Sequence, residues 1–399
     1  MHTAKPVQAV RLTLLWFGIQ LAWGVIIGIS LQARCAFLDP MHPLDAFAFV
    51  SIPGAIAAGL TQLVLGFVSD RLRRRGDKRL WFYAVGALGG AAGIVAFYLA
   101  PTLTALLVAY VGVQVAMNIV IGPYQAIIPD FVERSRIGVA SGWMAAMQSG
   151  GNAMGAVLAT LLGSTPWLGG AIAIVLLVSA AITVGYGRTL PLQPIQGEQR
   201  LLANLSLVDL FISRAFVYLG FYTLVGYLYF YIATLLPQRF PVNATTASGL
   251  CVLIFTLVGA VGAALAARPS DRLDERLVVS IGGVALALGV FVMAIVPALA
   301  VVPFAIVAAG IGWGVFLCAD WAFACRVLPN GALAGAMAIW NIAVVGPQMV
   351  VPILVTAVLA RLGALHATSG PKDAFVLAAA EILIGAAWIW RLPRRPTGK

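Results

Sequence analysis

The chain has 399 residues, of which 61% are hydrophobic and only 10% are charged, and its formal net charge is +11. Soluble domains carry about 25% charged residues, because water must wet their surface. The composition therefore excludes a water-soluble protein and predicts a chain whose main solvent is lipid.

Nine charge-poor stretches are long enough to cross a hydrocarbon core about 30 Å thick. In chain order they are Leu12–Ala33, Ala46–Ser69, Leu80–Pro129, Ile137–Gly187, Ala215–Gln238, Phe240–Ala267, Leu277–Cys325, Val327–Ala360 and Ala374–Trp390. The third, fourth and seventh are about twice as long as one span, so each must fold back once. Their turns are expected near Pro101, near Gly163–Pro166 and near Pro297–Pro303. The sum predicts twelve helices, because the stretches are apolar all round and do not alternate as barrel strands do.

The positive charges stand in short clusters between the spans, which is typical of membrane topology and not of nucleic-acid binding. With the N-terminus in the cytoplasm, all but five of the 25 lysines and arginines fall on the cytoplasmic side. The five are Arg34, Arg239, Arg361, Lys372 and, within a span, Arg214. This asymmetry predicts a multi-pass protein of the plasma (cytoplasmic or inner) membrane with both termini in the cytoplasm, which we expect to act as a monomer.

A short internal repeat divides the chain into two halves. The tetrapeptide Ser-Asp-Arg-Leu at 69–72 recurs at 270–273, and each copy follows the second span of its half. The predicted domains are a six-helix bundle at 1–187, a cytoplasmic linker at 188–206 and a second six-helix bundle at 207–399. Parallel repeats of this kind place a solute site between the halves near mid-membrane.

The loop after the second span resembles a known signature. Its sequence Gly-Phe-Val-Ser-Asp-Arg-Leu-Arg-Arg-Arg at 66–75 looks like the G-x-x-x-D-R-x-G-R-R motif of the major facilitator superfamily. In that family the Asp caps the N-terminus of span eleven, where it meets unsatisfied N–H groups, and the neighbouring arginines pair with acids of span four. The resemblance implies a cytoplasmic gate, and the alternative is a positive loop with solvated charges. The gate residues are Asp70, Arg71, Asp130 and Glu133, with Asp271 and Arg272 in the repeat.

A narrower resemblance covers spans four, seven, ten and eleven. The stretch Gly-Pro-Tyr-Gln-Ala-Ile-Ile-Pro-Asp at 122–130 is similar to the G-P-x-R-A-L-x-A-D stretch of sucrose–proton symporters, a branch that includes the glycoside–pentoside–hexuronide:cation symporters. The segment 214–221, Asp320-Trp321-Ala322 and Trp340-Asn341 look like the same branch. This similarity implies a sugar or glycoside moved with a cation. The family arginine is Gln125 here, and glutamines replace the sodium-binding carboxylates, which argues against sodium coupling.

Three charged residues, Arg214, Asp320 and Glu381, stand inside predicted spans, where each charge costs on the order of 3 kcal/mol. We hypothesise that Arg214 and Asp320 form an ion pair that breaks and reforms during transport, with Asp320 as the proton carrier. The alternatives are a permanent structural pair or an arginine that snorkels to the interface. Glu381 in the last span is interpreted as a structural or neutral carboxyl.

Amides and aromatic rings on the inner spans are candidate solute contacts, because amides offer donors and acceptors without charge and flat rings suit sugar faces. The alternative for each amide is an interhelical hydrogen bond. The candidates are Gln20, Trp23, Asn118, Gln125, Gln148, Asn152, Tyr218, Tyr222, Trp340 and Asn341.

The chain is therefore predicted to be a secondary transporter that moves a small neutral polar solute with a proton through the lipid bilayer. The alternatives are an exporter of apolar drugs or lipids and a non-transporting assembly factor or receptor on the same fold. No phosphate-loop, H-E-x-x-H or G-x-S-x-G motif is present, which argues against an ATPase or another enzyme. The cysteines have no metal-binding spacing. We expect no cofactor, no metal and no nucleic-acid partner.

Overall fold

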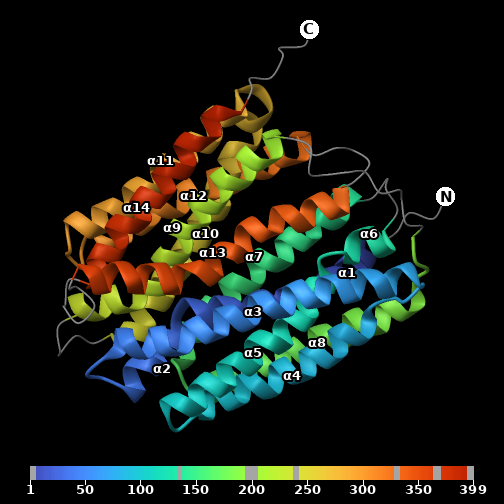
Figure 1. The fold of residues 1–399 in the computed structure, drawn as a ribbon, viewed down its shortest axis with the longest axis horizontal. Helices are drawn as coiled ribbons and strands as arrows, with labels where there is room; N and C mark the ends of the chain where they lie inside the picture. The colour runs from blue at the N-terminus through green and yellow to red at the C-terminus, as the bar shows by residue number, and fades with distance from the viewer. Residues whose placement is uncertain are drawn as a thin grey trace. The chain divides into compact units, whose positions relative to one another are not determined.

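The computed structural model describes residues 6–132, 137–193, 205–236, 242–327, 333–362 and 370–392. Over these ranges the chain is helical and contains no strand, which confirms the predicted all-α class (Figure 1). The elements are α1 (Pro6–Val25), the π-helical η1 (Ile26–Ser30), α2 (Leu31–Leu38), α3 (Pro43–Arg74), α4 (Leu80–Leu99), α5 (Leu103–Tyr124), α6 (Ile127–Phe131), α7 (Ile137–Leu162), α8 (Pro166–Thr189), α9 (Leu205–Leu235), α10 (Ala244–Arg272), α11 (Glu275–Ile295), α12 (Val302–Val327), α13 (Leu333–Arg361), α14 (Gly370–Trp388) and the 3₁₀ turn η3 (Ile389–Arg391).

The helices have the lengths that a bilayer demands. Eleven helical segments within the described ranges are long and apolar enough to cross a membrane. Helix α7, with 26 residues, is also longer than the roughly 20 residues that a span needs. All three predicted turns overlap breaks between helices, at Pro101 between α4 and α5, at 163–165 between α7 and α8, and at 296–301 between α11 and α12.

Local chemistry explains where several helices begin. Thr102, Asn243 and Asp274 each accept a backbone N–H in the first turn of α5, α10 and α11. Such side-chain caps satisfy N–H groups that have no partner within the helix. Gly163 ends α7 with φ +62°, a left-handed conformation that glycine adopts at little cost.

The first span has an irregular middle that the sequence did not predict. Helix α1 passes into the five-residue π-helix η1 and continues as α2, so the predicted span Leu12–Ala33 extends to Leu38. The Gln32 amide donates to the carbonyl of Ile27 over 2.6 Å, inside this widened turn. Arg34 lies in α2 and donates to the carbonyl of Ala100 at the end of α4.

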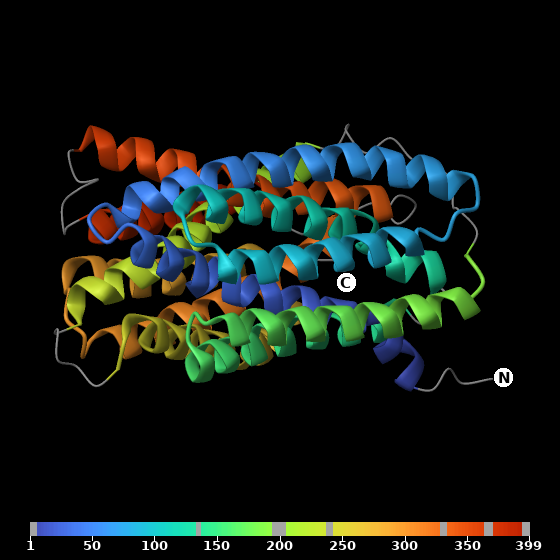
Figure 2. The same cartoon turned by 90° about the horizontal axis from the view of Figure 1, so that it is seen from below.

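The chain forms two compact units, residues 1–195 and 196–399. Within the first, α1 packs against α7 and α8, α4 packs against α5 and α8, and α3 packs against α5. The second repeats this pattern: α9 packs against α13 and α14, α11 packs against α12 and α14, and α10 packs against α12. Figure 2 shows the first unit's long helices running lengthwise beside each other. Residues 194–204 of the predicted linker lie outside the described residues.

In each unit a hydrogen bond connects a basic residue at the start of the third span with the residues that follow the last helix. In the first unit the Lys78 ammonium donates to the carbonyl of Leu190, just after α8, over 2.7 Å. In the second unit the Arg276 guanidinium donates to the carbonyl of Leu392, just after α14, over 2.8 Å, while Asp274 holds its other nitrogens. A hydrogen bond between these two parts of the fold therefore recurs in both halves.

Candidate functional site

A buried ion pair joins α9 to α12 within the second unit. The Arg214 guanidinium donates to the Asp320 carboxylate, and their side chains are only 6% and 1% exposed. A further guanidinium nitrogen lies 3.2 Å from the Tyr218 hydroxyl, and Cζ of Arg214 lies 4.8 Å from the centre of the Tyr218 ring. Charge pairing offsets much of the cost of burying each charge alone. The predicted contact between Arg214 and Asp320 is present, and its role in transport stays a prediction.

The pair lies near one end of both membrane helices. Arg214 follows the start of its apolar span at Val208 by six residues, about 9 Å of helix rise, and Asp320 closes the span that begins at Val302. In the predicted orientation this end faces the cytoplasm. The pair is therefore placed where a modest local opening would connect it to water.

Aromatic rings enclose the pair on the side away from that end. Tyr218 contacts Tyr222 at 6.1 Å and Trp313 at 5.1 Å between ring centres. Trp313 in turn stacks on Phe221 at 4.0 Å with an interplanar angle of 4°. Phe316 lies 5.8 Å from Trp313. The rings form an apolar cluster beside the ion pair.

Trp313 was missed by the sequence reasoning, although helical spacing carried the signal. Trp313, Phe316 and Asp320 stand at i, i+3 and i+7 on α12, which places them along one helix face. Arg214 and Tyr218 stand at i and i+4 on α9 and meet in the same way. A search for aromatic residues at these offsets from each intramembrane charge would have found the cluster.

The first unit joins its equivalent helices with neutral groups. There the Tyr124 hydroxyl at the end of α5 donates to the carbonyl of Leu12 in α1 over 2.8 Å, and the Trp16 ring lies 5.3 Å from the Tyr124 ring. Helices α1 and α5 hold the places in this unit that α9 and α12 hold in the other. An ion pair at this position is therefore a feature of the second unit and not a requirement of the fold.

Three of the predicted amides meet at the interface of α1 and α7. Gln20 Nε2 lies 3.5 Å from Gln148 Oε1, at the limit of a hydrogen bond. Asn152, one turn further along α7, lies against Gly24, where an added Cβ would come within 2.8 Å of its Oδ1. All three amides are partly exposed and are not saturated by this weak contact. They remain candidates for a solute.

The amides of Asn118 and Gln114 make hydrogen bonds along α5, and the solute contact predicted for Asn118 stays a prediction. Asn118 Nδ2 donates to the carbonyl of Gln114 over 2.8 Å, and Gln114 Nε2 donates to the Tyr110 hydroxyl over 2.7 Å. Asn118 and Gln114 are both buried. The Asn118 amide nitrogen is thus engaged along its own helix. Gln125 lies half-buried at the C-cap of α5.

The remaining predicted solute residues are only partly described. Trp23 lies half-buried in α1. Trp340 and Asn341 belong to α13 by their backbone, and their side chains lie outside the described part of the structure.

The predicted cytoplasmic gate contains an ion cluster with a different arginine. Asp130 pairs with Arg73, whose Nε donates to Oδ1 over 2.8 Å, and lies 3.5 Å from Nε of Arg79. Arg71, the expected partner, has an exposed side chain. A second nitrogen of Arg73 donates to the carbonyl of Gln193, after α8. The physical reason is helix phase: Arg73 and Arg71 are two residues apart, about 200° around α3, so only one of them can face Asp130.

The other gate predictions cannot be followed to their side chains. Asp70 lies in α3, and Asp271 and Arg272 lie at the end of α10, with side chains outside the described residues. Glu133 falls in the undescribed range 133–136.

Residues 13–352 of the chain match the family described as the Major Facilitator Superfamily. This match covers most of the sequence. The chain belongs to the major facilitator superfamily. A search of curated protein sequences finds no match for this facilitator.

Solved structures of membrane transporters share the fold of this facilitator. A bacterial homologue of the human lysosomal transporter Spinster, inward-facing and unoccupied, has a TM-score of 0.75 at 14% identity and 98% coverage of both chains. The structure of such a homologue in its inward-facing and occupied conformation has a TM-score of 0.73 at 15% identity and 98% coverage of both chains. A single-residue variant of the nucleoside transporter NupG has a TM-score of 0.70 at 16% identity, and the match covers 97% of this chain and 99% of the NupG chain. Identities this low establish the common fold alone.

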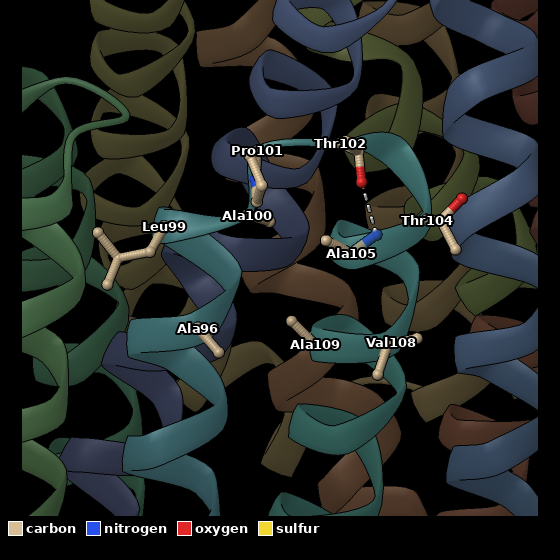
Figure 3. A pocket seen from close by; sticks show the side chains of 9 residues that line it. All are labelled: Ala96, Leu99, Ala100, Pro101, Thr102, Thr104, Ala105, Val108 and Ala109. Atoms are coloured by element: carbon tan, nitrogen blue, oxygen red, sulfur yellow. Dashed lines mark hydrogen bonds between the residues drawn. The ribbon is translucent and has the colours of Figure 1, made fainter.

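A separate hollow of about 670 Å³ lies in the first unit of the facilitator, at the turn from α4 to α5. Figure 3 shows the alanine, leucine, proline and threonine side chains that line it, with the Thr102 hydroxyl turned to the N–H of Ala105. No charged residue and none of the predicted solute residues lines it. Its polar side chains are those of Thr102 and Thr104, and the Thr102 hydroxyl already accepts the N–H of Ala105.

Proposed function

We propose that this facilitator is a secondary transporter that moves a small neutral polar solute, a sugar or glycoside, together with a proton by alternating access. The observation that carries the proposal is the buried pair of Arg214 and Asp320 beside Tyr218. It is a titratable carboxyl on a membrane helix with a cation as its partner.

The chemistry of the pair suits proton coupling. While Asp320 is ionised, Arg214 is neutralised and the two helices are held together. A proton on Asp320 would remove that attraction and free the guanidinium, which keeps its charge at any physiological pH. The released Arg214 and the Tyr218 hydroxyl could then donate to an oxygen of the solute. Proton binding and solute binding would thus favour the same state, which is the basis of coupling.

The solute class follows from the neutral donors and the rings. Gln20, Gln148 and Asn152 offer amide groups without charge, and Tyr218 and Tyr222 offer rings with hydroxyls. These are groups that recognise polyhydroxy compounds, in agreement with the resemblance to the sugar symporter branch. Nucleosides, the solutes named for NupG, are neutral glycosides and belong in the same test.

The test is a thermal-shift panel on the purified protein in detergent. The panel holds monosaccharides, disaccharides, aryl glycosides, nucleosides, apolar drugs and phospholipids. A stabilising hit among the neutral glycosides, followed by proton-dependent uptake of that compound into proteoliposomes, supports the proposal. Stabilisation by apolar drugs alone contradicts it.

The second candidate is an exporter of apolar compounds, and one observation favours it. Phe221, Trp313 and Phe316 form an aromatic wall that would also hold an apolar ring system. Such an exporter would respond to the drug or lipid arm of the panel. A receptor or assembly factor on the same fold would bind a compound without moving it into liposomes.

A further inference from the structure

We propose that Glu381 is a second proton-binding site, in which the carboxyl is held neutral and donates its proton to the Thr223 hydroxyl. Glu381 lies in α14, is 4% exposed and is part of the described apolar span Gly370–Arg391. It faces α9 within the second unit, where Oε2 lies 3.1 Å from Oγ1 of Thr223. The pair of Arg214 and Asp320 does not include it.

The Thr223 hydroxyl has one proton and two oxygens within reach, so it can donate to only one of them. The Thr223 hydroxyl lies 2.9 Å from the carbonyl of Leu219, one turn earlier on α9, and that carbonyl can only accept. A threonine hydroxyl has one proton to give and two lone pairs that accept. When that proton goes to Leu219, as threonine commonly does inside helices, the contact with Glu381 needs a proton from the carboxyl. Only the protonated acid supplies it.

The surroundings of Glu381 agree with a neutral group. Its second oxygen, Oε1, is buried with no hydrogen-bond partner among the described residues. A carboxylate in that setting would carry full charge with one contact, at a large desolvation cost, whereas the carbonyl oxygen of an acid tolerates the lack of a partner far better. No cation pairs with Glu381 within the described ranges.

Charged groups on the neighbouring helices lie at other heights along the helix axes than Glu381. On α9, Arg214 is nine residues from Thr223, about 14 Å of helix rise, and it already pairs with Asp320. Tyr222, next to Thr223 in sequence, has its ring against Tyr218 and Phe221. The charged groups of α11 and α14 stand at the ends of those helices, as Glu275 and Arg276 on α11, and as Lys372 and Asp373 at the start of α14 with Arg391 just beyond its end. On α13 the described charge is Arg361, at the last residue of the helix.

Asp320 provides an internal contrast within the same unit. Both carboxyls are almost fully buried, but Asp320 contacts a guanidinium and Glu381 contacts a hydroxyl. In this proposal Asp320 is therefore ionised in this state, and Glu381 is neutral. Glu381 would hold its proton while α9 and α14 stay packed, and it would serve as a hydrogen-bond donor that fixes these two helices.

Infrared spectroscopy of the purified protein in lipid tests this directly, because a protonated carboxyl has a carbonyl stretch that a carboxylate lacks. We expect such a band at neutral pH, its loss in Glu381→Gln and its retention in the matched control Asp320→Asn. The Thr223→Val protein should keep the band and shift its frequency, since the carboxyl O–H loses its acceptor. This second variant also decides the question if Glu381→Gln cannot be purified. A wild-type spectrum without the band, or a band that neither variant changes, would overturn the proposal.

A stability measurement separates the neutral acid from a carboxylate. Glutamine can donate to Thr223 as a neutral acid does, so Glu381→Gln should melt close to the wild type, whereas Glu381→Ala should melt lower. If Glu381→Gln raised the melting temperature strongly, relief of a buried charge would be the cause, and the proposal would be wrong.

Discussion

Replacement of Asp320 by alanine should strongly destabilise the second unit, because Arg214 would stay buried without its counter-charge. Removing one partner of a buried ion pair costs about 3–5 kcal/mol. The near-complete burial of both side chains places this pair in that range. For a domain of this size the loss corresponds to a fall in melting temperature on the order of 10 °C. Arg214→Ala should have a similar effect.

The double variant Arg214→Met with Asp320→Leu should be more stable than either single variant. Replacing both members of a buried pair by apolar side chains is often neutral, since no charge is left in the interior. The Tyr218 hydroxyl would lose one partner, at a cost of about 1 kcal/mol. Arg214→Met and Asp320→Leu should therefore be non-additive, because each alone should cost about 3–5 kcal/mol while the double variant should lose only about 1 kcal/mol.

Thermal unfolding in detergent, followed by tryptophan fluorescence, measures the wild type, Arg214→Met, Asp320→Leu and the double variant under one condition, with Asp320→Ala beside them. Trp313 lies beside Tyr218 and reports on this region. The reasoning would be refuted if the two single losses simply added in the double variant. It would also be refuted if Asp320→Ala melted like the wild type.

Three further changes test other parts of the account by the same melting assay. Arg73→Ala should lower stability by about 3 kcal/mol, because its buried carboxylate partner loses its closest cation, while Arg71→Ala should change it by less than about 0.5 kcal/mol. Gly151→Ala should lower stability by about 1–3 kcal/mol, since its Cβ would come within 2.4 Å of a carbonyl of α1. Gly112→Ala should raise stability by up to about 1 kcal/mol, because its Cβ would meet nothing within 4 Å. Tyr218→Phe should cost about 0.5–1.5 kcal/mol through the lost hydrogen bond to the guanidinium.

Each of these changes carries its own control. Equal effects of Arg71→Ala and Arg73→Ala would contradict the assignment of Arg73 as the partner of Asp130. If Gly151→Ala were neutral, the close packing of α1 on α7 would not hold. A Tyr218→Phe protein as stable as the wild type would show that the phenol contributes through its ring alone.

The sequence was sufficient for the architecture because lipid imposes a simple rule. Runs of about 20 apolar residues must be helices, so Pro101 and Gly163 could be placed between spans from composition alone. The repeated tetrapeptide marked the two halves, and the matching helix contacts of the two units agree with it. Arg214 and Asp320 could be paired because each was a rare charge at a similar depth in its span.

Side-chain partners were harder to predict where several similar residues compete. Arg71 and Arg73 are equivalent in composition, and only the phase of α3 decides which one reaches Asp130. The hydrogen bond of the Asn118 amide to the carbonyl of Gln114, one turn away, was not predicted. The π-helix in the first span was not predicted, and the Gln32 amide donates to the carbonyl of Ile27 inside it. Such choices rest on details of packing that periodicity does not contain.

The most direct test of the central claim is proton movement that accompanies the solute in proteoliposomes. With the compound selected by the thermal-shift panel, inward solute flux should draw protons inward in the wild type and should fail to do so in Asp320→Asn, while solute exchange without a gradient persists. Proton uptake that is unchanged in Asp320→Asn would contradict the account.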